Sequence, residues 1–372
     1  MAKMHPAEHA LKYAWHDEVG EGIRPLGYCR MVVLGVGGAG NNTVSRLMEM
    51  GITGAECIAI NTDALHLNAS RAHQKRLIGE KLTKGLGVGG DPKLGRASIE
   101  ESRKRIEELL TDADIVFITA GLGGGTGTGA APVIAEIARR KEAITVGVVT
   151  TPFRIEKGRM EYAANALTEM RRQCDTVVVI DNNKLMQLVP QLPINEAFRV
   201  ADQVLANMIR GIVETISAPS LINLDFADFK TIVRRGGVAV VGVGESDAPN
   251  RAEEAVRNAL RSPLLDVDYA GARGALIHVS GDSEMTIEEV NRVGEIVTEM
   301  MDDDALVIWG ARINPERAGL LKVTLVMTGV NSPYILSGFG AIAPQLFNLE
   351  PYAEPEKPLD IKLNLHQLEN FQ

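Results

Sequence analysis

The segment at 121–129, GLGGGTGTG, most strongly limits how this chain can fold, because six of its residues are glycines. It follows an apolar run at 115–119 and precedes a helical segment that begins near residue 130. A turn between a strand and a helix needs only one or two glycines. Backbone without Cβ atoms that leads into a helix N-terminus, interleaved with two threonine hydroxyls, offers a series of N–H donors. The loop therefore favours the binding of a polyphosphate.

A second glycine-rich loop, GVGGAG at 35–40, also lies between an apolar run and a helical segment. It fits the GxGxxG pattern in the context that this pattern requires, and Asp63 stands near the end of the next apolar run, where an acid that binds ribose is expected. On its own this loop is typical of a dinucleotide site, with a tight turn as the structural alternative. No GxxxxGK[ST] segment occurs in the chain, so neither loop is a P-loop.

The chain beyond residue 30 alternates short apolar runs with longer amphipathic segments, which predicts βαβ units around a mostly parallel sheet. The runs are apolar at successive residues, as expected of strands that helices cover on both faces. Strands are predicted at 31–34, 57–60, 115–119, 144–149 and 176–180. Helices are predicted at 41–50, 92–110, 130–139 and 159–171. The first half is therefore predicted to be an α/β domain.

A longer helix is predicted at 195–216, where apolar residues recur at spacings of three and four. It would be about 33 Å long, enough to join two domains. Beyond it, strands are predicted at 237–244, 274–280, 305–310 and 320–328, and helices at 250–260 and 287–300. These elements indicate a second, smaller α/β half.

Composition excludes several classes of protein. The 372 residues carry a net charge of −9 and only 4% are aromatic, so a basic surface interleaved with aromatic side chains, typical of nucleic-acid binding, is not expected. The three cysteines, Cys29, Cys57 and Cys174, form no CxxC pair, which argues against a disulfide framework or zinc site and favours the reducing cytoplasm. No segment resembles a signal peptide or approaches the ~20 apolar residues of a membrane span. We therefore expect no direct membrane insertion.

A set of motifs in the same order resembles the tubulin/FtsZ family of GTPases. The family signature is matched by GGGTGTG at 123–129, and the likeness extends over about residues 31–330 with GGAGNN at 37–42, NTDA at 61–64, GLGVGGDP at 85–92, TPF at 151–153 and NLDFAD at 223–228. The resemblance implies an N-terminal Rossmann-like GTPase domain with a parallel sheet, a long central helix and a smaller C-terminal α/β domain that activates hydrolysis. The implied divisions are an N-terminal arm at 1–29, the GTPase domain at 30–193, the helix at 194–217, the activating domain at 218–330 and a tail at 331–372.

The resemblance also implies where GTP or GDP would bind. The two glycine loops would hold the phosphates, Thr62 and Asp63 would lie beside a Mg²⁺ that phosphates and water mainly coordinate, and Glu156 would meet the ribose. Asp202 would accept from the guanine N–H groups, since a buried carboxylate rejects a base that leaves it unpaired. The implied GTP-binding residues are Gly37, Gly38, Asn41, Asn42, Thr62, Asp63, Gly87, Gly89, Gly90, Gly121, Gly123, Gly124, Gly125, Thr126, Gly127, Thr128, Glu156, Arg159, Asn182, Phe198 and Asp202.

The catalytic residues that the resemblance implies are Asn223, Asp225 and Asp228, which follow the long helix. About 33 Å of helix separates them from the nucleotide end, so they cannot readily act on their own chain's nucleotide. In the family, this segment enters the site of the next subunit of a head-to-tail polymer, where the aspartates polarise the attacking water and Asn223 positions the loop. From the residues alone, a helix cap with a solvated acid is the alternative.

The family resemblance implies a self-assembling cytoplasmic protein that is recruited to the division ring at mid-cell. Division adaptors or membrane-anchor proteins are expected to bind its acidic C-terminal tail, and nucleic acid is not an expected partner. Two other classes remain at this point. One is a Rossmann dehydrogenase that uses the loop at 35–40 and Asp63, with His66 and His73 as ordinary histidines. The other is a filament protein that binds nucleotide without hydrolysing it, against which the intact Asn223, Asp225 and Asp228 count.

Overall fold

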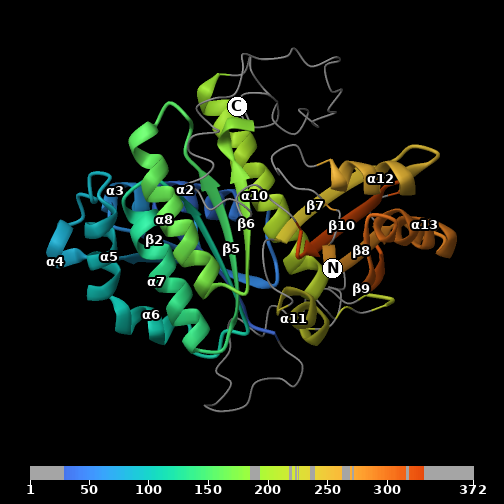
Figure 1. Cartoon of the computed structure of the whole chain (residues 1–372), viewed down its shortest axis with the longest axis horizontal. Coiled ribbons are helices and arrows are strands. Elements are labelled where there is room, and N and C mark those ends of the chain that lie inside the picture. Colours follow the sequence, from blue (N-terminus) through green and yellow to red (C-terminus); the bar gives the residue numbers. More distant parts are fainter. Residues whose placement is uncertain are drawn as a thin grey trace, which may run out of the picture.

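The computed structural model describes residues 29–184, 193–217, 220–222, 224, 226–234, 239–261, 269, 272–315 and 318–330. Two sheets with their helices lie on either side of one long helix, α10 (Ile194–Ser217) (Figure 1). The arm at 1–28 and the tail at 331–372, to which adaptor binding was assigned, lie outside the described residues.

The first sheet has six parallel strands in the order β3-β2-β1-β4-β5-β6. Every residue of four of them is buried, as the apolar runs predicted. The bounds are β1 (Met31–Val36), β2 (Ala55–Asn61), β3 (Gln74–Leu77), β4 (Ile115–Gly121), β5 (Ile144–Thr151) and β6 (Thr176–Asp181). The strand order reverses between β1 and β4, and the two glycine loops leave the carboxyl ends of these neighbouring strands. Ligands bind α/β sheets at such a switch point.

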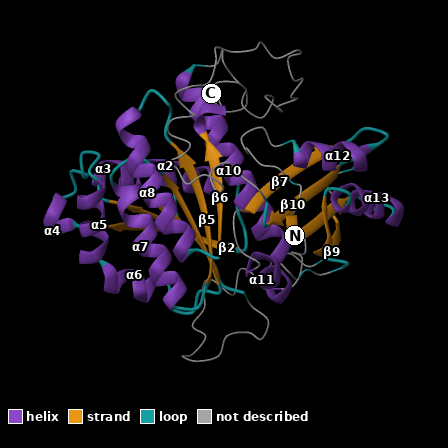
Figure 2. Ribbon diagram, viewed as in Figure 1, coloured by secondary structure: helices purple, strands orange, loops and turns teal. Residues whose placement is uncertain are grey.

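Helices cover both faces of this sheet (Figure 2). Val33 belongs to a core shared with α2 (Gly37–Glu49) and α10, whereas its neighbours Val32 and Leu34 face the core of α7 (Thr126–Arg140) and α8 (Lys157–Gln173). The remaining helices of this half are α3 (Ala64–Ala69), α4 (Glu80–Thr83), α5 (Pro92–Glu101) and α6 (Arg103–Leu109). The first half is thus the Rossmann-like fold that was predicted.

Several local features of this half differ from the sequence prediction. Helices α2 and α7 begin at Gly37 and Thr126, four residues before their predicted starts. The helix expected at 92–110 is divided at Ser102, whose φ of −101° and ψ of 6° interrupt it. The short helices α3 and α4 were not predicted, because neither is long enough to show a helical period. Strand β3 was missed because it is a partly exposed edge strand of sequence QKRL without an apolar run.

The second sheet has four strands in the order β7-β10-β8-β9, with β10 antiparallel to β7 and β8. Its strands are β7 (Ala239–Ser246), β8 (Ala272–Gly281), β9 (Met301–Ile313) and β10 (Leu321–Thr328). The helices of this half are α11 (Phe226–Arg234), α12 (Arg251–Leu260) and α13 (Ile287–Thr298). Strands occur in all four predicted places, and β9 extends beyond its predicted range at both ends.

Helix α10 joins the two halves through one continuous apolar core. Its buried residues Leu205, Ile209 and Val213 belong to a cluster that includes residues of both sheets. Polar contacts add to this: the Lys322 Nζ of β10 lies 3.3 Å from a Glu214 carboxylate oxygen on α10. With 24 residues, α10 is about 36 Å long, so it separates the element before it from α11 after it. In the described part of the chain, no helix is both long and apolar enough to cross a membrane.

Candidate active site

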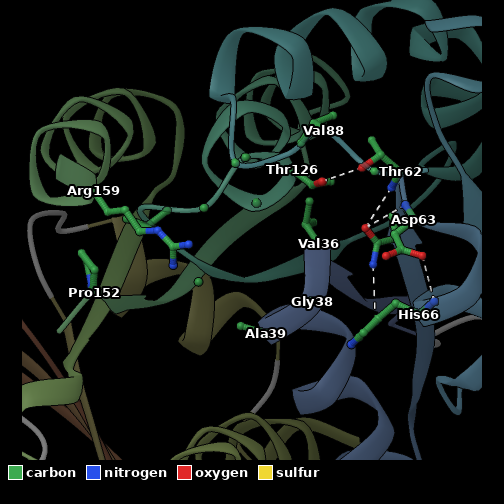
Figure 3. Close-up of a pocket in the computed structure, with 18 of the residues that line it drawn as sticks. Val36, Gly38, Ala39, Thr62, Asp63, His66, Val88, Thr126, Pro152 and Arg159 are labelled. Atoms are coloured by element: carbon green, nitrogen blue, oxygen red, sulfur yellow. Dashed lines mark hydrogen bonds between the residues drawn. The ribbon is translucent and has the colours of Figure 1, made fainter. Parts of the chain in front are cut away.

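An open pocket of about 460 Å³ lies at the carboxyl ends of the central strands of the first sheet (Figure 3). Loops that follow β1, β2, β4, β5 and β6 line it, together with the loop between α4 and α5 and the start of α10. The lining residues are Val36, Gly38, Ala39, Asn61, Thr62, Asp63, His66, Leu86, Gly87, Val88, Gly89, Gly90, Gly121, Leu122, Gly124, Gly125, Thr126, Gly127, Thr150, Pro152, Phe153, Glu156, Arg159, Asn182 and Phe198.

Most residues that the sequence assigned to nucleotide binding meet in this pocket. Those outside its lining are Gly37, Asn41, Asn42, Gly123, Thr128 and Asp202. Asn223 and Asp225 lie outside the described residues, and the half-buried Asp228 lies in the first turn of α11. The lining residues that sequence reasoning missed are Val36, Ala39, Asn61, His66, Leu86, Val88, Leu122, Thr150, Pro152 and Phe153. Most of them are neighbours of predicted residues within the same loops.

Two pocket glycines have no structural reason to lack a side chain. A Cβ added to Gly124 would meet nothing within 4 Å, and one on Gly38 would meet only the His66 ring, at 3.9 Å from Nε2. Other glycines of the same loops are structurally required: a Cβ on Gly40 would lie 2.3 Å from the Thr119 carbonyl oxygen, and one on Gly129 only 2.1 Å from that of Pro92. The space at Gly38 and Gly124 is therefore open to a ligand.

Several predicted residues, inside and outside the lining, hold the loops in place. The Gly123 backbone N–H donates to Thr128 Oγ1 at 2.9 Å, which closes the glycine-rich loop before α7. The Thr62 and Thr126 hydroxyls lie 2.7 Å apart and tie the loop after β2 to the start of α7 (Figure 3). Asn41 is fully buried, and its amide nitrogen donates to the Gly35 carbonyl oxygen at 2.8 Å in the orientation that its neighbours require.

The two helices that point at the pocket, α2 and α7, start without a side-chain cap and carry no acidic residue in their first turn. The first N–H groups of a helix have no partner within the helix, and its dipole attracts negative charge. Because Gly38 and Gly124 leave these ends open, the arrangement suits phosphate oxygens.

The opposite side of the pocket is aromatic and polar. Phe153 and Phe198 meet edge to face, with ring centroids 5.5 Å apart and an interplanar angle of 76°. Glu156 accepts from the Phe153 N–H at 3.1 Å and is also paired with Arg159. Figure 3 shows Arg159 and Pro152 on the side of the pocket away from Thr62 and Asp63.

Asn182 supplies an unpaired acceptor in this region. Its Oδ1 atom is buried and has no hydrogen-bond partner among the described residues. An unsatisfied buried acceptor costs roughly 1–3 kcal/mol. A ligand that donates an N–H group here would relieve that cost.

The acids that line the pocket within the described residues are Asp63 and Glu156. Asp63 Oδ1 caps α3 by accepting from the N–H groups of Leu65 and His66, which leaves Oδ2 for a water molecule of a hydrated cation. Among the described residues, no group of three or more His, Cys, Asp or Glu side chains could hold a metal ion. A cation here would therefore depend on ligand oxygens and water.

Asp202 lies one helical turn beyond Phe198 on α10. Burial raises the pKa of its carboxyl to about 7, against the opposing effects of Arg46 and a hydrogen bond with Thr43.

Because the pKa of Asp202 in the folded protein lies above the usual value, the nucleotide-free protein should lose stability as the pH rises from about 4 through 7. Asp202→Asn is expected to raise Tm at pH 8 by roughly 5 °C, from about 2 kcal/mol, and this gain should shrink as the pH falls to 4. Calorimetry across this range checks it, and a gain independent of pH would contradict it.

Comparison with known proteins assigns each half of the chain to a family. The model of the Tubulin/FtsZ family, GTPase domain, matches residues 30–190, and that of the FtsZ family, C-terminal domain, matches residues 237–331. Cell division protein FtsZ 2 of Methanocaldococcus jannaschii is 56% identical over 314 residues, which cover 84% of this chain and 83% of that protein. Cell division protein FtsZ 1 of Thermococcus kodakarensis is 49% identical over 340 residues, which cover 91% of this chain and 89% of that protein.

A solved FtsZ dimer from M. jannaschii is 44% identical, with a TM-score of 0.76, and the match covers 95% of this chain and 100% of that one. Likeness in sequence and fold thus extends over both halves. This excludes the dehydrogenase alternative. The chain therefore belongs to the tubulin/FtsZ family of GTPases.

Proposed function

We propose that this protein polymerises head to tail into protofilaments of a cell-division ring and hydrolyses GTP at the contact between subunits. The observation that carries the proposal is the separation of pocket and acidic segment by α10. Phe198, near the start of this helix, lines the pocket, whereas α11 with Asp228 follows its end (Figure 1). About 29 Å of helix lies between Phe198 and the last residue of α10, Ser217. A single chain therefore keeps its nucleotide and its Asp228 apart, and a second copy would bring them together.

The pocket's own residues do not replace Asp228. Hydrolysis of a phosphoanhydride needs its charge neutralised and a water oriented in line with the leaving group. The open helix ends suit the first task. Of the two acids that line the pocket among the described residues, Asp63 caps α3 through Oδ1 and leaves Oδ2 to the hydrated cation, and Glu156 is paired with Arg159, so we assign the attacking water to neither. We assign that role to Asp225 and Asp228 of the neighbouring subunit, with Asn223 positioning their loop.

Exposed apolar side chains at both ends of the molecule support a head-to-tail contact. Leu86, which lines the pocket, is 83% exposed, and Leu65 and Ile155, each next in sequence to a lining residue, are 82% and 89% exposed. Near the start of α11, Leu221 is 72% exposed and Trp309 40%. Burying both groups against each other would remove apolar surface from water at each contact.

We assign the nucleotide as follows. The phosphates lie against the first turns of α2 and α7, near Gly38 and Gly124, and the ribose lies near Glu156. Guanine lies by Phe198, where Asn182 Oδ1 takes an N–H and Asp202 selects the base. Mg²⁺ would bind phosphate oxygens and water beside Thr62 and Asp63, and would supply charge neutralisation. Gly37, Asn41, Gly123 and Thr128 would shape the loops that hold the phosphates, and Asn42 and Arg159 would lie beside guanine.

We further propose that the protein is cytoplasmic and is recruited to the division ring at mid-cell. The names of the relatives, cell division proteins, support a role in division. Adaptors or membrane-anchor proteins would bind the tail at 331–372. The proposed divisions of the chain remain 1–29, 30–193, 194–217, 218–330 and 331–372.

Turnover per subunit is expected to rise steeply with protein concentration, because each site is completed by a neighbour. Phosphate release from GTP, measured over a hundredfold range of concentration alongside sedimentation with GTP or GDP, tests this. Activity should rise over the same range in which the GTP sample begins to sediment. Constant turnover per subunit would indicate a self-sufficient site and contradict the proposal.

Assembly is expected to depend on Mg²⁺ and ionic strength, because subunits of net charge −9 repel each other. Light scattering with GTP should show weak assembly at low salt without Mg²⁺, and stronger assembly when either is raised to screen the charge. A matched series with Na⁺ at equal ionic strength separates screening from binding of Mg²⁺ to the nucleotide. Polymerisation that is indifferent to both would contradict this expectation.

A further inference from the structure

His66 lies on the phosphate side of the pocket, although its sequence context marks it as an ordinary histidine. It belongs to α3 and is half-buried. Figure 3 shows its ring lying against the start of α2, where Gly38 and Ala39 are labelled. The Nε2 atom is 3.9 Å from the position that a Cβ on Gly38 would occupy. The ring thus faces the open space into which the first turn of α2 points.

The hydrogen bonds of Asn61 determine which ring nitrogen carries the proton. Asn61 Oδ1 accepts from the N–H groups of Thr62, at 2.9 Å, and Asp63, at 3.3 Å. The other end of the amide is therefore its NH₂ group, which donates to Asn41 Oδ1 at 3.0 Å and faces His66 Nδ1 at 3.4 Å. Nδ1 must offer its lone pair to this donor. In the neutral ring, the proton is then on Nε2.

We propose that His66 is a phosphate-binding residue whose Nε2–H donates a hydrogen bond to a phosphate oxygen of the nucleotide held by the first turn of α2. This inference rests on the proposed binding of GTP in the pocket. Asn61 and Asn41 act as positioning residues, because they fix the tautomer that presents the donor. The contact adds a side-chain donor to the backbone N–H groups of α2, on the side of the phosphates where Gly38 leaves room.

Two variants with amide side chains distinguish the role of Nε2 from that of Nδ1. His66→Gln extends an NH₂ group to the place of Nε2, whereas His66→Asn reaches only the place of Nδ1 and can still meet Asn61. His66→Ala removes both. Asn68→Ala, at an exposed position of the same helix, is the matched control. The measurement is the affinity of each full-length variant for GDP and for guanosine, by calorimetry or by competition with a fluorescent guanine nucleotide.

For GDP, we expect His66→Asn and His66→Ala to bind about 10-fold or more weakly, His66→Gln within about threefold of the unmodified protein, and Asn68→Ala unchanged. Guanosine lacks the phosphates, so its affinity should be the same in all variants. Unchanged GDP affinity in His66→Asn, or an equal loss for guanosine, would overturn this inference alone. If the unmodified protein bound neither ligand, the proposed function itself would fail and this inference with it.

Discussion

Asp228→Ala is expected to bind GTP as the unmodified protein does, and to assemble with it, but to lose at least about 100-fold in turnover. Asp228 lies in the first turn of α11, which follows the end of α10 opposite to the pocket, and it is not among the lining residues, so its removal leaves these in place. What is lost is the carboxylate that polarises water in the neighbouring site, and acid–base groups of this kind contribute typically 10²–10⁴-fold. Phosphate release and nucleotide affinity, measured on the same preparation, check both parts.

Asp225→Ala is expected to behave in the same way. Asp303→Ala is the matched control, because Asp303 is an exposed acid on β9 with no part in the pocket. It should retain normal turnover. Normal hydrolysis by Asp228→Ala would remove this residue from catalysis, and a loss of GTP affinity in that variant would indicate a structural role instead.

Gly124→Val is expected to fold normally and to lose GTP affinity by at least about 100-fold. Its Cβ would meet no protein atom within 4 Å, so the folded chain should tolerate the side chain. The added methyl groups would occupy the space in front of α7 where we place the phosphates. Equilibrium binding of GTP measures the loss, and Tm of the nucleotide-free protein shows that the fold is intact.

Two glycine variants serve as controls for this prediction. Gly294→Ala, in α13, also adds a Cβ into open space, but far from the pocket, and should leave both GTP affinity and Tm close to normal. Gly129→Ala should lower Tm, because its Cβ would lie 2.1 Å from the Pro92 carbonyl oxygen. Normal GTP affinity in Gly124→Val would contradict the assignment of this loop to the phosphates.

Much of the fold could be predicted from sequence because buried parallel strands carry runs of successive apolar residues. This held for β1, β2, β4, β5 and β6, and the period of α10 was equally clear. Strand β3 escaped because an edge strand can be polar, and α3 escaped because one and a half turns show no period. Helix α3 carries His66 into the pocket lining, so one of the elements that sequence missed contributes to the site.

The site could be predicted to the level of its loops but not of its individual atoms. Motif spacing identified the glycines without showing which ones face open space: Gly124 does, whereas Gly129 is required by the Pro92 carbonyl. Nor can spacing show that Asn41 points into its own loop. Sequence did not identify His66 as a site residue because the tautomer of its ring depends on Asn61. The orientation of the Asn61 amide is in turn set by backbone contacts within the folded loop.

The shared site is tested most directly by mixing two inactive variants, Asp228→Ala and Gly124→Val. The first variant has an intact pocket but no Asp228 to place in a neighbour's site. The second has a blocked pocket and an intact Asp228. If the site forms between subunits, Gly124→Val should complete the pocket of Asp228→Ala, and the mixture should release phosphate from GTP although neither variant does so alone. A mixture as inactive as its two components, at concentrations where the unmodified protein is active, would contradict hydrolysis at the subunit interface.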